Sequence, residues 1–94
     1  MAYTFEWDAD KADANVRKHG VSFSEASTAF NDPLSATIED ARHSGEEERY
    51  VLFGISERGR LLAVMHTERD GVIRIISARK ATRPEQREYE DEEL

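Results

Sequence analysis

The pattern of hydrophobic and polar residues changes along the chain, and each period predicts a different kind of element. Residues 3–7 alternate aromatic and polar side chains, which predicts a short first strand with Tyr3, Phe5 and Trp7 facing the core. A period of two returns after Pro33, and short glycine-containing turns separate the later strands. Because short connections favour antiparallel neighbours, these segments predict a four-stranded meander. Its strands are expected at 34–39, 49–56, 60–67 and 72–79.

Capping signals between these strands predict two helices near the N-terminus. Asp8 is a suitable N-cap for a helix that runs to about His19, and Gly20 fits the left-handed position that follows such a helix. Segment 22–25, Ser-Phe-Ser-Glu, has the spacing of a capping box, in which the serine binds a free backbone N–H and the glutamate reaches back. Pro33 ends the second helix, because proline disfavours helical geometry in the residue before it.

A second capping box, Thr82 to Glu85, predicts a last helix from about Arg83 to Tyr89, and the acidic tail over about residues 90–94 is expected to fray. The order of elements predicts one α+β domain over residues 1–94. In this domain the N-terminal helices and the C-terminal helix pack on an antiparallel four-stranded sheet, with a short N-terminal strand. The part of the sheet left uncovered is a platform for a ligand or a partner.

Composition limits the class of protein. A chain of 94 residues fits a single domain, and the absence of cysteine excludes disulfides and thiolate metal sites. The N-terminal segment has no apolar signal region, and no stretch approaches about 18 apolar residues. We therefore expect a cytoplasmic protein with no membrane segment.

The net charge of −7 at first argues against a nucleic-acid enzyme, but the charges are segregated. The segment from Arg58 to Arg83 is basic, and only Glu68 and Asp70 oppose its arginines and lysine. Such a segment can present an anion-binding face on an acidic protein. The alternative is that these arginines are solvated strand and turn residues paired with the acidic segments.

Several kinds of chemistry have no support in the sequence. The three histidines show none of the spacings of a zinc site, and no glycine-rich phosphate loop or serine-nucleophile motif is present. We therefore expect no metal and no cofactor. The remaining arginine, lysine, histidine and glutamate suffice for metal-free RNA cleavage, because RNA brings its own 2′-hydroxyl nucleophile. The protein then has to orient that oxygen, move a proton and stabilise charge on the phosphate.

Four charged residues near predicted strand ends are the main candidates, and each has an ordinary structural alternative. Arg79 ends the last predicted strand and can clamp a phosphate or pair with a nearby glutamate. Arg74 interrupts an aliphatic run and points away from its isoleucine neighbours, toward either an RNA face or solvent. Glu48 and Arg49 open a strand after a charged loop, where they can act as base and clamp or as salt-bridge partners.

The other candidates have stronger structural explanations. Lys18 and His19 lie in the last turn of the first predicted helix, where cations suit the helix dipole. His43 lies in the charged loop, where a solvated histidine is ordinary. His66 lies in a predicted strand among apolar residues and is expected to be packed and hydrogen-bonded.

These residues belong to motifs that span almost the whole chain. Segments 5–33, 43–69 and 73–90 resemble the BrnT toxin family through the sequences FEWD, KHGVSF, EER, the GISERGR hairpin and RIISARKA. The resemblance implies a fold like that of the RelE-type toxins. It also implies a bacterial toxin of a type II toxin–antitoxin pair, with metal-independent ribonuclease activity that inhibits translation. A BrnA-like antitoxin would neutralise it, and the pair would meet operator DNA only through that antitoxin.

The resemblance also marks a set of site residues. In the working mechanism Arg49 and Arg79 hold the phosphate, Arg74 assists, and Lys18 or Glu48 manages protons. The alternative function is a non-catalytic, toxin-like binding module that acts only through its antitoxin complex. The residues assigned to RNA binding rather than catalysis are His19, His43, Arg60 and Lys80.

Overall fold

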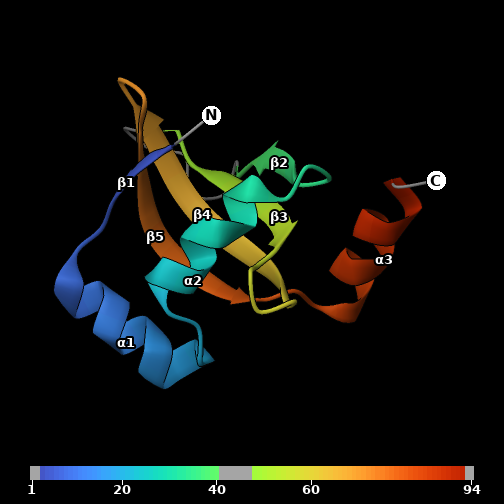
Figure 1. Ribbon diagram of the computed structural model, residues 1–94, viewed down its shortest axis with the longest axis horizontal. Coiled ribbons are helices and arrows are strands. Elements are labelled where there is room, and N and C mark those ends of the chain that lie inside the picture. Colours follow the sequence, from blue (N-terminus) through green and yellow to red (C-terminus); the bar gives the residue numbers. More distant parts are fainter. Residues whose placement is uncertain (1–2, 41–47, 93–94) are drawn as a thin grey trace.

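A computed structural model describes residues 3–40 and 48–92, which form one sheet with helices on both faces (Figure 1). None of the helices in these ranges is long and apolar enough to cross a bilayer. The elements in chain order are β1 (Thr4–Glu6), α1 (Ala9–His19), α2 (Phe23–Thr28), the 3₁₀ turn η1 (Ala29–Asn31), β2 (Ala36–Glu39), β3 (Tyr50–Ile55), β4 (Leu61–Arg69), β5 (Val72–Lys80) and α3 (Arg83–Glu92).

The sheet has the strand order β1-β5-β4-β3-β2. The antiparallel meander expected from the sequence is present as β2 to β5. The expectation of a four-stranded antiparallel sheet is corrected in one respect, because β1 pairs in parallel with β5 and makes a fifth strand. This pairing covers part of the outer edge of β5, which would otherwise expose unpaired backbone groups.

Tyr3, Phe5 and Trp7 face the core as expected, since their rings contact the core residues Phe30 and Phe23, but the two outer rings are only partly covered. Phe5 lies opposite Ile73 and is partly buried against the core, but Tyr3 and Trp7 are 51 % and 38 % exposed. Both rings lie at the margin of the core, where Tyr3 packs edge-on against Phe30. The reason is that β1 is a short edge strand, so its end residues have no neighbouring strand to cover them.

The main core lies between the sheet and the layer formed by α1, α2 and η1. Gly54 shows how closely the two layers approach, since a Cβ at this position would lie 2.5 Å from the carbonyl oxygen of Ala29. Only glycine lets the backbone of η1 rest on β3 there. The core is formed by Val21, Phe23, Ala26, Ala29, Phe30, Leu52, Leu62, Val64, Ile73, Ile75 and Ala78.

Helix α1 begins and ends as its capping residues predict. The carboxylate of Asp8 accepts the N–H of Lys11 at 2.9 Å, and Gly20 takes the left-handed conformation with φ 69°. The buried side chain of Asn15 then fixes the helix to the free edge of β5. Its amide donates to the carbonyl of Ala78 at 2.8 Å and accepts the N–H of the same residue at 3.2 Å, as a neighbouring strand would. The amide also donates to the carbonyl of Val21 at 2.8 Å.

The capping box expected at α2 forms only in part. The hydroxyl of Ser22 accepts the N–H of Glu25 at 3.0 Å, but the carboxylate of Glu25 turns away from the helix start. It accepts hydrogen bonds from Ser56 at 2.8 Å and from the guanidinium of Arg60. A two-pronged, charge-assisted contact with arginine is stronger than one bond to a backbone N–H, which explains the choice.

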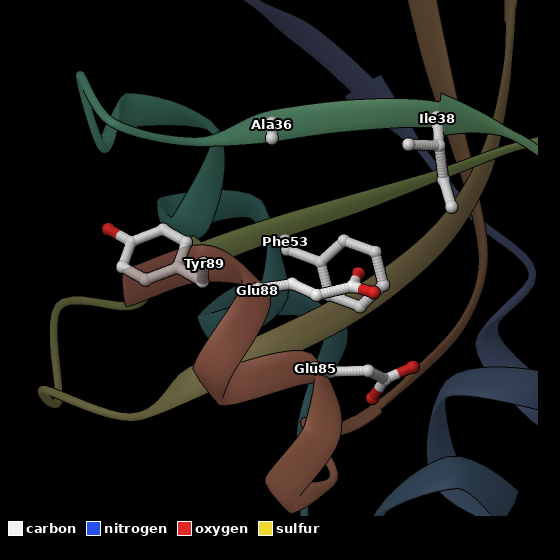
Figure 2. Close-up of a pocket in the computed structure, with 6 residues that line it drawn as sticks. All are labelled: Ala36, Ile38, Phe53, Glu85, Glu88 and Tyr89. Carbon is white, nitrogen blue, oxygen red and sulfur yellow. The ribbon is translucent and has the colours of Figure 1, made fainter. Parts of the chain in front are cut away.

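Helix α3 packs on the opposite face of the sheet from α1 and α2. Phe53, the neighbour of Gly54 in β3, points to that face and borders a small pocket with Ala36, Ile38 and residues of α3 (Figure 2). Tyr89 is buried, and its hydroxyl donates to Asp32 at 2.5 Å. This anchor lies near the end of the helix, and α3 runs to Glu92, past its expected end at about Tyr89.

The role of Asn15 leads to a stability prediction. We expect Asn15→Ala to lower the free energy of unfolding by about 2–4 kcal/mol, because it leaves buried backbone groups of β5 and Val21 without partners. Urea denaturation measures the change. The control Asn31→Ala, at an exposed position, should change stability by less than about 0.5 kcal/mol. Equal effects of the two substitutions would show that the hydrogen bonds of Asn15 to the edge of β5 contribute no more to stability than an exposed side chain does.

Candidate functional site

A β-bulge in β5 decides which arginines share a face of the sheet. Met65 of β4 pairs with Ser77, but the next residue, His66, pairs with Ile75, so Ile76 has no partner. Strict alternation would place Arg74 and Arg79 on opposite faces. The extra residue restores them to the same face, the one that α3 partly covers.

This face, opposite α1 and α2, is called here the far face. Arg74 pairs with Thr67, and Arg49 continues the same row on β3, because the following residue, Tyr50, pairs with His66. Arg79 lies two rows away, beside Ala63. The arginines therefore surround the middle row of the far face, which presents Val51, Met65 and Ser77. The result is a partly apolar floor with guanidinium groups at its margins.

Two of these arginines are held by carboxylates. The guanidinium of Arg74 contacts Glu6 of β1 at 2.9 Å, in a pair whose side chains are 45 % and 54 % exposed. Arg79 binds both carboxylate oxygens of Glu85 in α3, at 2.7 and 3.0 Å. Arg49 is partly buried immediately before β3, and its carbonyl accepts the N–H of Asp40 at 2.7 Å. The alternative raised from the sequence, arginines paired with acids, is thus present at Arg74 and Arg79.

The pair between Arg79 and Glu85 also fixes the start of α3. The hydrogen bonds from Arg79 outweigh the effect of burial and lower the pKa of Glu85 to about 2. The same carboxylate accepts the N–H of Thr82 at 2.8 Å, and the hydroxyl of Thr82 accepts the N–H of Glu85 at 3.4 Å. The second capping box is therefore confirmed, and it presents to Arg79 a carboxylate that stays ionised.

A second group of sequence candidates lies at one end of the sheet, where β5 ends and α1 meets α2. Lys18 is exposed and His19 is partly buried in the last turn of α1, and Lys80 is exposed opposite Leu62. The guanidinium of Arg60 is bound to Glu25 and also donates to the carbonyl of Gly20 at 3.1 Å. Arg60 therefore has a structural role, tying the β3–β4 turn to the start of α2.

The remaining candidates lie elsewhere. Glu48 precedes β3 at the opposite end of the sheet from Lys18 and accepts the hydroxyl of Tyr50 at 2.6 Å. Lys18 and Glu48 are thus not brought together with each other. His43 lies outside the described residues. Within the described ranges no three histidine, aspartate or glutamate side chains gather as a metal site requires.

His66 has the packed, hydrogen-bonded position expected from the sequence. It is 5 % exposed, and its Nδ1 lies 3.1 Å from the carbonyl oxygen of Val64. Burial lowers the pKa of its imidazole despite the opposing effects of that carbonyl and of Glu68. The ring is therefore neutral at neutral pH.

The comparison with known families decides the class of the protein. The model of the BrnT family, ribonuclease toxins of type II toxin–antitoxin systems, matches residues 7–85. The chain belongs to this family. As a BrnT-family toxin it has an antitoxin as its partner class. The search of curated proteins returned no match.

The fold agrees with this assignment. The crystal structure of the ribonuclease toxin BrnT from Brucella abortus aligns with a TM-score of 0.67 at 19 % sequence identity. The alignment covers 87 % of this chain and 100 % of that chain. At this identity the match establishes a shared fold, so the roles of single residues in the BrnT-family chain depend on their own geometry.

The fold uses two acidic residues in ways that sequence reasoning missed, since it gave Glu25 only a capping role and Asp32 none. Glu25 is 4 % exposed, and its contact with Arg60 more than offsets burial and lowers its pKa. Burial acts to raise the pKa of Asp32, but hydrogen bonds from Tyr89 and from the N–H groups of Ile55 and Leu34 lower it overall. The segment Asn-Asp-Pro signalled a turn at Asp32, but nothing local indicated its distant partners.

The low pKa of Glu85 gives a prediction for acid stability. A carboxyl group with a depressed pKa contributes stability that is fully present above its ordinary value of 4.5 and is lost as the pH falls toward about 2. We expect Glu85→Gln to flatten this part of a plot of unfolding free energy against pH. Glu25 and Asp32 keep the remaining slope, since their pKa values are also lowered.

The exposed turn residue Glu57 provides the control for this experiment. Glu57→Gln should leave the acid profile as it is in the parent. An unchanged profile in Glu85→Gln would mean that the contact with Arg79 is not maintained in solution.

Proposed function

We propose that this chain is a metal-independent ribonuclease that inhibits translation, and that it binds RNA on the far face. The observation that supports this site most directly is the β-bulge, which gathers Arg49, Arg74 and Arg79 around one floor. Arginine suits the task because its fixed fork of donors matches phosphate oxygens. The apolar side chains of Val51 and Met65 between the arginines offer a surface on which a base can rest.

The spacing of the arginines suggests how the working mechanism should be revised. Arg49 and Arg74 lie two strands apart in one row, about 10 Å between backbones, so both side chains can converge on one phosphate. Arg79 is about 13 Å from Arg74 along the strand, a distance suited to a neighbouring phosphate. In this proposal Arg49 and Arg74 stabilise charge on the reacting phosphate, and Arg79 holds the RNA in register.

Among the described carboxylates of the far face, Glu6 is the candidate proton acceptor because it is the one in contact with Arg74. Glu6 contacts Arg74 on the exposed part of the face, whereas Lys18 and Glu48 lie at the two ends of the sheet. We assign Glu6 as the general base that takes the proton of the 2′-hydroxyl. When RNA binds, the guanidinium of Arg74 exchanges its contact with Glu6 for a contact with the phosphate. The carboxylate of Glu6 is then available to accept the proton. An exposed ion pair of this kind contributes little to stability, so the exchange costs little.

The antitoxin in this proposal is BrnA-like, and operator DNA is bound through it and not by this chain. The acidic net charge of −7 agrees with such a division, because an acidic toxin attracts a basic partner and has little affinity of its own for duplex DNA.

RNA cleavage by the purified chain in the presence of EDTA tests the proposed activity. We expect the parent to cleave, and Arg74→Ala to reduce the rate about 100-fold or more, the cost typical of removing a donor that stabilises transition-state charge. Arg17→Ala, an exposed arginine of α1, is the matched control and should cleave as the parent does. Cleavage that stops with EDTA contradicts the metal-free mechanism. A folded parent without activity favours the binding-module alternative.

A matched pair of glutamate variants tests the assignment of the base. Glu6→Gln should lower the cleavage rate by about 10²–10⁴-fold, the usual contribution of a general base, and should leave RNA binding almost unchanged. Glu48→Gln should keep the parent rate, because its carboxylate is bonded to Tyr50 away from the far face. The reverse result would return the role to Glu48 and overturn the assignment.

A further inference from the structure

The face of the sheet under α1 and α2 carries a hollow that the proposed ribonuclease site does not use. It has a volume of about 440 Å³ and lies where β3 begins and β4 ends, next to η1. Aromatic rings of Tyr3, Phe30 and Tyr50 border it, together with the imidazole of His66. Because this is the opposite face from Arg74 and Arg79, a ligand in the hollow does not compete for the far face.

The aromatic rings of the hollow form a continuous group. The ring centroids of Phe30 and His66 lie 4.9 Å apart in an edge-to-face arrangement, and those of Tyr50 and His66 lie 5.9 Å apart. Tyr3 adds a ring that packs on Phe30 at 5.9 Å while remaining half exposed. Faces of aromatic rings attract cations, most strongly when the cation is partly removed from water.

Carboxylates give the hollow a negative charge. Glu68 lines it, and Tyr50 donates its hydroxyl to Glu48 at 2.6 Å. That bond, together with the nearby charges of Glu39, Glu48 and Glu68, raises the pKa of the Tyr50 phenol. The described residues that line the hollow include no lysine or arginine. A phosphate would be repelled here, whereas a cation would be attracted.

His66 adds an acceptor at the base of the hollow. The carbonyl of Val64 can only accept a hydrogen bond, so Nδ1 of the neutral ring carries the proton and Nε2 has a lone pair. A guanidinium or ammonium group that enters the hollow would find this acceptor, a carboxylate and ring faces within one space.

We propose that the hollow binds the side chain of an arginine or lysine presented by a protein partner. We infer that this partner is the antitoxin, and that identification rests on the proposed function. The chemistry by which the hollow recognises a basic side chain does not depend on it. Charge complementarity favours this occupant over an RNA base. The phosphate backbone of an RNA would be repelled by the nearby carboxylates of Glu39, Glu48 and Glu68. The hollow then acts as a specificity pocket for one basic side chain.

Titration of the ¹⁵N-labelled chain with Nα-acetyl-arginine amide tests this recognition by nuclear magnetic resonance. We expect shifts in the backbone resonances of Tyr50, His66 and Glu68, with a dissociation constant on the order of 1 mM, as ligand efficiency suggests for a molecule of this size. The matched ligand is Nα-acetyl-citrulline amide, which has the same shape without the charge. It should bind at least about tenfold more weakly, because it lacks the cation that the ring faces and carboxylates attract.

Two variants sharpen the test. Glu68→Gln should weaken binding of the arginine amide about three- to fivefold, the range for one exposed carboxylate, and Glu57→Gln should leave it unchanged. Equal binding of the two amides, or no shift at ten times the expected dissociation constant, overturns the proposal. So does a short RNA that shifts the same resonances more strongly. None of these readouts uses RNA cleavage, so failure of the proposed function would leave them interpretable.

Discussion

The register of β5 is the constraint on which the two sides of this molecule depend. With Ile76 unpaired, Ile73 and Ile75 face the helices in one half of the strand, and Ala78 does so in the other half. The same shift turns Arg74 and Arg79 to the far face. Without the bulge, one of these arginines would enter the core, where an unpaired charge costs several kcal/mol. Core packing and arginine placement are therefore satisfied by the same irregularity.

Acidic residues hold this arrangement in place from outside the sheet. Glu25 binds Arg60 and Ser56 and so attaches the β3–β4 turn to α2. Glu85 does the same for α3 through Arg79, and Asp32 joins that helix to β3. Part of the acidic composition that first argued against a nucleic-acid enzyme is therefore explained by these contacts. The arginines of the protein are positioned by carboxylates of the same chain.

Local signals predicted the elements well. The caps at Asp8, Gly20 and Thr82 set helix ends because each acts within a few residues. The meander followed from alternation and short turns. The parallel pairing of β1 was not predictable, since a short edge strand carries no pattern that names its neighbour. The turn of Glu25 toward Arg60 was missed for a related reason, because the partner lies far away in the chain.

The candidate site was only partly predictable. The BrnT resemblance directed attention to Arg49, Arg74 and Arg79, but only the three-dimensional register shows that they share a face. The doublet Ile75–Ile76 interrupts alternation and was a visible sign of the bulge. The end-of-sheet residues Lys18 and Glu48 belong to the same motifs, yet the fold separates them. Residues that belong to one sequence motif need not meet in space.

Chemical-shift mapping with an RNA whose 2′-hydroxyls are replaced by hydrogen tests the central claim most directly, because such a strand binds without being cleaved. The account predicts that the largest shifts fall on far-face residues, with Arg49, Met65, Arg74 and Arg79 among them, and that they weaken as salt is added. Shifts confined to Lys18, His19 and Lys80 at the end of the sheet would contradict it and place RNA on the other group of cations.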